Sequence, residues 1–246
     1  MKTLYLIPVP IGTHKDVFPK INETIINEID LFIVENAKTV RAFLKDILTF
    51  PIQQANIVEI YNGKDENACI DEIKKTSTNA KIALLSEAGC PAVADPGAII
   101  VKKCHELGIK IVPLVGPSSI ILSLMASGLN GQSFTFNGYL PQKGEERTNK
   151  LTQLEKISST HNQTQIFIET PYRNNQMLKA LVDVLNANTL LCVASNLHCD
   201  NQLIKTQSIA AWKKEKINFD DMPTIFLFLA NGKVTNANAK KCFKRF

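Results

Sequence analysis

The chain has 246 residues, of which 45% are hydrophobic and 21% are charged. These values are ordinary for a soluble globular protein. No apolar run approaches the roughly 20 residues that a membrane-spanning helix needs, so a membrane protein is excluded at this stage. The length is enough for one large domain or two modest ones.

The net charge of +5 comes from the end of the chain. Five basic residues and no acidic ones follow position 232: Lys233, Lys240, Lys241, Lys244 and Arg245. The rest of the chain has 23 basic and 23 acidic residues. We interpret 233–246 as a basic tail. Two roles are open for it: contact with nucleic-acid phosphates, or a solvated terminus that only aids solubility.

Two further features indicate the cellular compartment. Pro8 and Pro10 interrupt the apolar start of the chain, which predicts a first β-strand rather than a signal peptide. The six cysteines form no CxxC pair and no Cys/His group with zinc-site spacing. We therefore expect reduced thiols, no metal site and a cytoplasmic protein.

The first 136 residues alternate between strand-like and helix-like patterns. Apolar runs predict strands, and three- and four-residue apolar spacing predicts helices. The expected strands are 4–8, 31–35, 57–60, 81–85 and 109–114, and the expected helices are 18–29, 40–48, 66–75, 98–107 and 118–127. This alternation predicts an α/β domain over 1–136 with a largely parallel sheet.

A cluster of turn-forming residues follows: Asn137, Gly138, Pro141 and Gly144. We interpret 137–145 as a linker and 146–232 as a second α/β domain. In the second domain we expect helices at 146–157 and 173–186, and strands at 165–169, 189–194, 203–208 and 224–230.

Three unusual loops each follow a predicted strand. They are 8–12 (PVPIG), 86–97 (SEAGCPAVADPG) and 116–119 (GPSS). Ligands gather at the carboxyl ends of strands in open α/β sheets, so the three loops together predict a binding site. There is no GxGxxG or GxxxxGK[ST] motif and no Ser/His/Asp arrangement, so the sequence does not support a hydrolase or a kinase.

Six segments resemble motifs of the bacterial 16S rRNA small subunit methyltransferase I group, in the same order. They are 4–12, 86–97, 112–119, 126–129, 136–141 and 166–173. That group belongs to the tetrapyrrole methylase superfamily. The resemblance implies two α/β domains with a cofactor cleft between them, S-adenosylmethionine as the cofactor, and a homodimer.

Carried over position by position, the resemblance also implies which residues line the cofactor. In the first domain these are Pro10, Gly12, Ala88, Gly89, Pro91, Ala94, Asp95, Ser118 and Ser119. In the second domain, Phe167, Ala194, Ser195, Pro223 and Thr224 match lining positions more loosely.

Several polar motifs depart from the family pattern. EDTR reads ENAK at 35–38, DHNE reads NGKD at 62–65, ELTK reads NLHC at 196–199, and a later glutamate is Gln202. A site that hydrogen-bonds its substrate discriminates through such groups. We therefore expect a divergent paralogue that keeps the cofactor and differs in its methyl acceptor.

Three functions are open at this stage. The first is methylation of a ribose 2′-hydroxyl, with ribosomal RNA of the small subunit as partner and rRNA processing as the role. The second is methylation of a tetrapyrrole or another small molecule, and the third is an inactive cofactor- or RNA-binding paralogue. A hydroxyl acceptor must lose a proton, for which Glu35 and Glu169 are the candidate groups, and Lys38 or Arg173 are candidates for phosphate contact.

Overall fold

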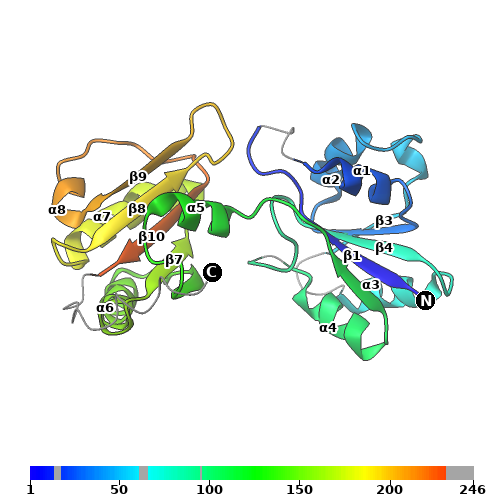
Figure 1. The fold of residues 1–246 in the computed structure, drawn as a ribbon, viewed down its shortest axis with the longest axis horizontal. Coiled ribbons are helices and arrows are strands. Elements are labelled where there is room, and N and C mark those ends of the chain that lie inside the picture. The colour runs from blue at the N-terminus through cyan, green and yellow to red at the C-terminus, as the bar shows by residue number, and fades with distance from the viewer. Residues whose placement is uncertain (14–17, 61–65, 95, 231–246) are drawn as a thin grey trace, which may run out of the picture. The chain divides into compact units, whose positions relative to one another are not determined.

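The computed structural model describes residues 1–13, 18–60, 66–94 and 96–230. The chain divides into two compact units, Met1–Ser119 and Ile120 onward. Figure 1 labels their helices and strands, and each unit is described by itself.

Unit 1 contains a five-stranded, all-parallel sheet in the order β3-β2-β4-β1-β5. Its strands are β1 (Thr3–Ile7), β2 (Leu31–Val34), β3 (Ile57–Glu59), β4 (Lys81–Leu85) and β5 (Lys110–Pro113). Because all five run in one direction, the segments that follow them emerge at one edge of the sheet.

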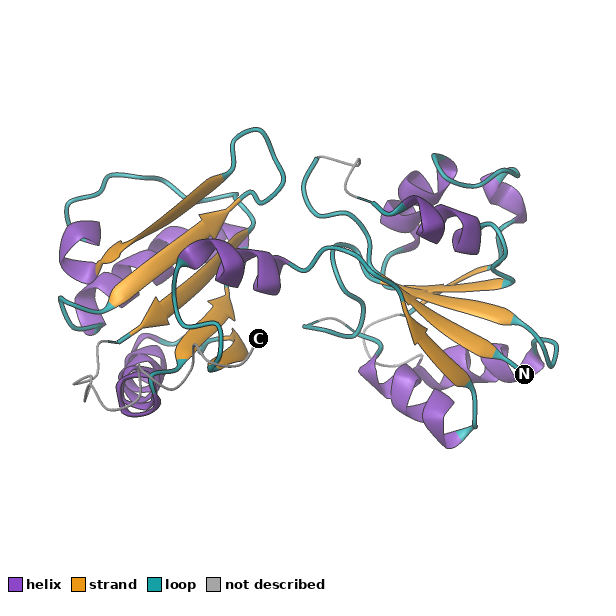
Figure 2. Ribbon diagram, viewed as in Figure 1, coloured by secondary structure: helices purple, strands orange, loops and turns teal. Residues whose placement is uncertain are grey.

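Helices cover both faces of this sheet (Figure 2). They are α1 (Lys20–Ile26), α2 (Ala37–Lys45), α3 (Glu66–Lys75) and α4 (Ala98–Glu106). Alternate residues of β2 serve the two sides: Phe32 and Val34 pack with α1 and α2, and Leu31 and Ile33 pack with α3 and α4. Burial on both faces explains why β2 is apolar at every position.

Unit 2 contains a mixed five-stranded sheet in the order β6-β7-β10-β8-β9. Only the pair β6–β7 is parallel, and the other three pairs are antiparallel. Its strands are β6 (Phe134–Tyr139), β7 (Thr164–Ile168), β8 (Leu190–Ser195), β9 (Leu203–Ser208) and β10 (Thr224–Leu229).

The second sheet is also covered on both faces. Helix α5 (Ser119–Ser127) contributes Leu124 to a cluster on one face. On the other face, α6 (Gly144–His161), α7 (Asn174–Val184) and α8 (Ile209–Trp212) pack on a core of aromatic side chains. In that core the rings of Phe167 and Phe226 stack with their centroids 5.7 Å apart.

Most expected elements are observed, but β6 and α8 were not expected, and the segment 137–145 differs from its prediction. This predicted linker contains the end of β6 and the start of α6, and the compact units divide after Ser119 instead. Asn137 and Gly138, two of the turn residues that suggested a linker, lie at an irregularity in β6 where the register shifts between Phe136 and Tyr139, and Gly144 begins α6. The predicted basic tail, 233–246, lies outside the described residues.

Within the described parts of the chain, no helix is long and apolar enough to cross a membrane. The same residues contain no group of three or more histidine, cysteine or acidic side chains that could hold a metal ion.

Helix α2 begins with a side-chain cap that the sequence change at 35–38 supplies. Asn36 Oδ1 accepts hydrogen bonds from the backbone N–H groups of Lys38 and Thr39, at 3.0 and 3.2 Å. We expect Asn36→Ala to lower the free energy of unfolding by about 1 kcal/mol, because two N–H groups lose their acceptor. Asn36→Asp keeps an acceptor there and should stay close to wild type in urea denaturation. Equal stability of all three proteins would contradict this role.

Candidate functional site

The first two predicted loops are joined by backbone hydrogen bonds. Strands β1 and β4 are neighbours, and just beyond them Val9 and Gly89 exchange two N–H···O bonds of 3.0 Å. Gly89 has a φ of +76°, a conformation that glycine adopts without steric cost. Ser86 Oγ donates to the carbonyl of Gly89 at 2.9 Å and fixes the turn from within.

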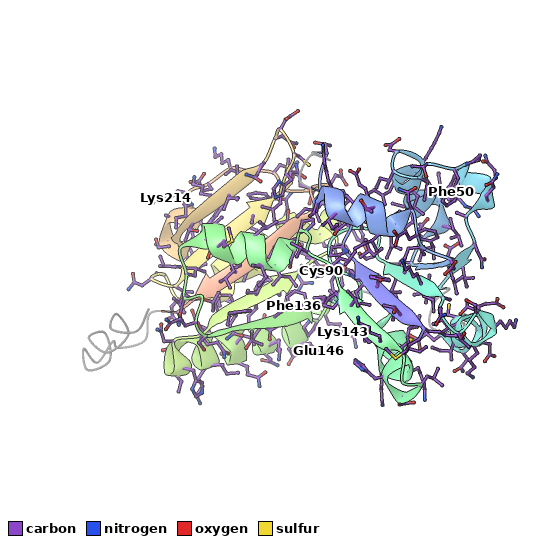
Figure 3. The ribbon with its side chains drawn as sticks, turned by 45° about the vertical axis from the view of Figure 1, so that its right-hand side comes forward. Phe50, Cys90, Phe136, Lys143, Glu146 and Lys214 are labelled. Atoms are coloured by element: carbon purple, nitrogen blue, oxygen red, sulfur yellow. The ribbon has the colours of Figure 1, made fainter. Side chains whose placement is uncertain are left out.

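The third loop packs against the other two. A Cβ atom added at Gly116 would lie 2.5 Å from Cβ of Pro8, so only a glycine allows this approach. The thiol of Cys90 donates a hydrogen bond to the carbonyl oxygen of Pro117, with the two atoms 3.4 Å apart. Figure 3 labels Cys90 in the second loop. The three loops predicted from sequence therefore form one structure in unit 1.

The second loop holds non-glycine residues in a costly backbone conformation. Ala92 and Ala94 have φ values of 63° and 66°, in the left-handed region. This conformation costs an L-residue roughly 1–2 kcal/mol. Backbone strain of this kind is concentrated at ligand-binding sites, so it agrees with a functional role for the loop.

A cavity of about 260 Å³ opens beside the first two loops. The residues that line it are Val9, Pro10, Gly12, Thr39, Val40, Ala42, Phe43, Ser86 and Glu87. Small-molecule sites usually have volumes of about 300–1,000 Å³, so this cavity accommodates part of a nucleoside-sized ligand.

Two carboxyl groups lie at the same edge. Glu35 follows β2, and its Oε2 accepts a hydrogen bond of 3.1 Å from the backbone N–H of Glu87. The Glu87 carboxylate accepts a hydrogen bond from Thr39 Oγ1 at 3.2 Å. Burial raises the pKa of Glu35, and the nearby charge of Glu87 adds to the rise, against the lowering effect of the Glu87 N–H. Glu35 thus fixes the second loop to the end of β2.

The residues predicted in unit 2 are mostly enclosed. Phe167 is fully buried in the aromatic core, and Ala194 is 1% exposed. The hydroxyl oxygens of Ser195 and Thr224 lie 2.8 Å apart and share a hydrogen bond. Pro223 is exposed, and its carbonyl accepts from the N–H of Asn196 at 2.9 Å.

The second candidate carboxyl, Glu169, has a different environment from Glu35. Its Oε1 accepts from Nε and Nη2 of Arg173, at 2.9 and 2.7 Å, and from the N–H of Thr170 at 2.7 Å. Its Oε2 is buried with no hydrogen-bond partner among the described residues. The carboxylate fixes the guanidinium, which makes Arg173 part of an ion pair rather than an isolated phosphate contact.

The predicted residues of unit 1 that the structure describes lie on the three joined loops, and of them Pro10 and Gly12 line the cavity. Gly12 and Ala94 have positive φ, Pro91 is buried, Ala88 is exposed, Ser118 is half-buried, and Ser119 begins α5. Asp95 lies outside the described residues. Thr39 and Glu87 also line the cavity, although neither was predicted. Glu87 directly precedes the predicted residue Ala88, and its acidic side chain in that loop was the available signal.

Residues 3–211 match the family described as Tetrapyrrole (Corrin/Porphyrin) Methylases. The chain belongs to the tetrapyrrole methylase family. Membership confirms the resemblance inferred from the loop motifs and places the chain in a family of methyltransferases.

Similar relatives carry the name ribosomal RNA small subunit methyltransferase I. The chain is 34% identical to the protein from Buchnera aphidicola subsp. Schizaphis graminum, over 86% of this chain and 72% of the relative. It is 32% identical to the Vibrio cholerae serotype O1 protein, over 79% of this chain and 64% of the relative. The chain thus spans just under two thirds of the Vibrio protein.

Solved structures show the same fold at low sequence identity. The methyltransferase CobJ matches with a TM-score of 0.64 and 12% identity, over 94% of this chain and 95% of the other. A putative diphthine synthase from Entamoeba histolytica matches with a TM-score of 0.62 and 15% identity, over 94% and 93%. These similarities confirm the predicted α/β fold class.

The contact between Gly116 and Pro8 predicts a specific sensitivity to one added methyl group. We expect Gly116→Ala to lower the free energy of unfolding by about 1–3 kcal/mol, because the rigid proline ring must move. Gly131→Ala is the matched control, since no atom lies within 4 Å of the added Cβ. The measurement is urea denaturation of both variants. A Gly116→Ala protein as stable as the Gly131→Ala protein would show that the loops do not pack this way.

The environment of Glu35 predicts a pH-dependent effect on stability. A raised pKa in the folded state means that folding favours the protonated form of Glu35. The protonated carboxyl therefore contributes to stability below the ordinary pKa of 4.5, and this contribution is lost as the pH rises through the folded-state pKa. Glu35→Gln keeps an acceptor for the Glu87 N–H but has no charge. The free energy of unfolding of Glu35→Gln, measured relative to wild type, should therefore be higher at pH 7 than at pH 4. The change between the two pH values should be less than about 1 kcal/mol, because solvent screens the group. Thermal denaturation at both pH values tests this, and a pH-independent difference would contradict it.

Proposed function

We propose that this chain transfers a methyl group from S-adenosylmethionine to RNA of the small ribosomal subunit. The observation that carries the proposal is the joined set of three loops at one edge of the unit 1 sheet, in a chain of the tetrapyrrole methylase family. The names of the relatives support the choice of acceptor.

The residues of unit 1 fit a cationic, nucleoside-containing cofactor. The lining of the cavity that includes Pro10 and Gly12 combines apolar side chains with the polar residues Ser86 and Glu87. Glu87 is exposed, and its carboxylate together with that of Glu35 gives this edge negative charge, which favours a sulfonium cation. When bound, the cofactor supplies a methyl group that is already activated for displacement.

The chain's own contribution is then positioning. Gly89 and Gly116 let the three loops approach closely, and Ser86 and Glu35 hold the second loop in place. From this set we propose that Pro10, Gly12, Ala88, Gly89, Pro91, Ala94, Ser118 and Ser119 hold the cofactor. We also propose a homodimer, from the family resemblance, and a cytoplasmic location, from the β-strand at the start of the chain and the scattered cysteines.

Glu87 provides a direct test of cofactor binding. We expect Glu87→Gln to weaken S-adenosylmethionine binding about fivefold, since a solvent-exposed charge at a few ångströms contributes about 1 kcal/mol. Calorimetry measures the affinity, and Glu145→Gln, an exposed carboxylate at the start of α6, is the matched control. Equal affinities of wild type and Glu87→Gln would move the cationic group away from this edge.

The acceptor is tested with S-adenosylmethionine labelled on its methyl group. Purified protein is incubated with total RNA and, separately, with extracts of small molecules. The proposal predicts label in RNA of the small subunit. Label only in small molecules would identify the other kind of methyltransferase, and cofactor binding without transfer to either would identify an inactive paralogue.

A further inference from the structure

Two exposed tyrosines lie in the part of unit 2 that holds the Glu169–Arg173 ion pair: Tyr172 precedes Arg173, and Tyr139 pairs with Ile168, which precedes Glu169. Tyr172 is 67% exposed and Tyr139 is 58% exposed. The guanidinium carbon of Arg173 lies 5.2 Å from the centre of the Tyr172 ring. The hydrogen bond to Glu169 is the main reason that the pKa of Arg173 is raised.

The irregularity in β6 determines where Tyr139 lies. The register of β6 against β7 shifts between Phe136 and Tyr139, and Gly138 between them has a φ of 63°. Asn137 Nδ2 stabilises this bulge by donating to the carbonyl of Ile166 at 3.3 Å. Bulges re-aim the side chains that follow them. Here the bulge sets Tyr139 opposite Ile168, the residue just before Glu169.

Glu169 fixes the plane of the guanidinium. The Glu169 side chain is 1% exposed and the Arg173 side chain 18% exposed, and two guanidinium nitrogens bond to one carboxylate oxygen. Arg173 is thereby ordered before any ligand binds, which reduces the entropy that a ligand must overcome. Because the pair is neutral overall, long-range attraction of phosphate is weak here.

We propose that Tyr172, Arg173 and Tyr139 form a stacking platform for unpaired bases of an RNA acceptor. This inference rests on the proposed function and adds that the RNA acceptor is a single-stranded segment. Bases of an A-form helix are stacked on each other and unavailable, whereas unpaired bases stack on aromatic rings and guanidinium planes. Glu169 is a positioning residue for this platform.

The test variant is Tyr172→Ala, because this ring is two-thirds exposed and its loss leaves the buried ion pair intact. The probe is a fluorescently labelled single-stranded RNA of about 12 nucleotides, the length scale of single-strand binding sites. Fluorescence anisotropy should show binding weakened about tenfold, as expected for the loss of one base–aromatic stack. The dependence of affinity on salt should be unchanged, since no charge is removed.

Two controls separate stacking from other effects. Tyr172→Phe keeps the ring and should bind RNA as wild type does. Met125→Ala removes a 75% exposed side chain from α5 and should also leave RNA affinity unchanged. Equal loss in Tyr172→Phe and Tyr172→Ala would show that the hydroxyl acts, and would overturn the stacking proposal.

Cofactor calorimetry on the same proteins distinguishes this proposal from the proposed function. If wild type binds RNA and Tyr172→Ala binds it equally well, the platform is overturned and the RNA acceptor stands. If wild type binds S-adenosylmethionine but no RNA, both the acceptor and the platform are overturned. A smaller salt dependence in Tyr172→Ala would indicate a phosphate contact and would also contradict stacking.

Discussion

The two backbone hydrogen bonds between Val9 and Gly89 connect the loops that follow neighbouring parallel strands. They form because β1 and β4 end at the same edge and because Gly89 adopts a positive φ without a side chain in the way. With this pair in place, Gly116 can pack on Pro8 and the third loop joins the other two. The three loops of the candidate site are therefore joined mainly through backbone contacts and glycine positions.

The two candidate carboxylates serve this architecture in different ways. Glu35 connects β2 to the second loop through the Glu87 N–H and keeps partial contact with solvent. Glu169 is enclosed and neutralised by Arg173. A partly solvated carboxylate beside a cavity contributes charge to a ligand, whereas an enclosed and paired one mainly fixes its neighbour. The two residues look equivalent as family carboxylates in the sequence, and only their surroundings separate them.

Unit 1 was predictable because its signals are local. Apolar runs, helical spacing and loops at strand ends gave nearly every element, and their shared edge followed from the parallel order. Unit 2 was less so. Asn137 and Gly138 read as a linker, although the same residues form a bulge within β6. Strand direction in the second sheet depends on how distant segments pair, which periodicity does not encode. The paired hydroxyls of Ser195 and Thr224 arise from such pairing across β8 and β10.

The departures from the family motifs also gain a local explanation. Asn36 caps α2, and Asn196 and His198 have φ values of 49° and 59° in the turn after β8. Asparagine tolerates the left-handed conformation better than most residues, and Gln202 Oε1 accepts from the N–H of His198 at 3.0 Å in the same turn. Asn36 and Gln202 thus have local structural roles, which weakens the argument that these two residues mark a changed acceptor. The 62–65 segment lies outside the described residues.

The central claim is that three separate loops bind one methyl donor. Hydrogen–deuterium exchange with and without S-adenosylmethionine measures this directly, because amides in a binding site exchange more slowly when the ligand is bound. We expect slower exchange in all three segments together, 8–12, 86–91 and 116–119. Protection confined to one segment, or protection elsewhere in the chain without these three, would contradict it.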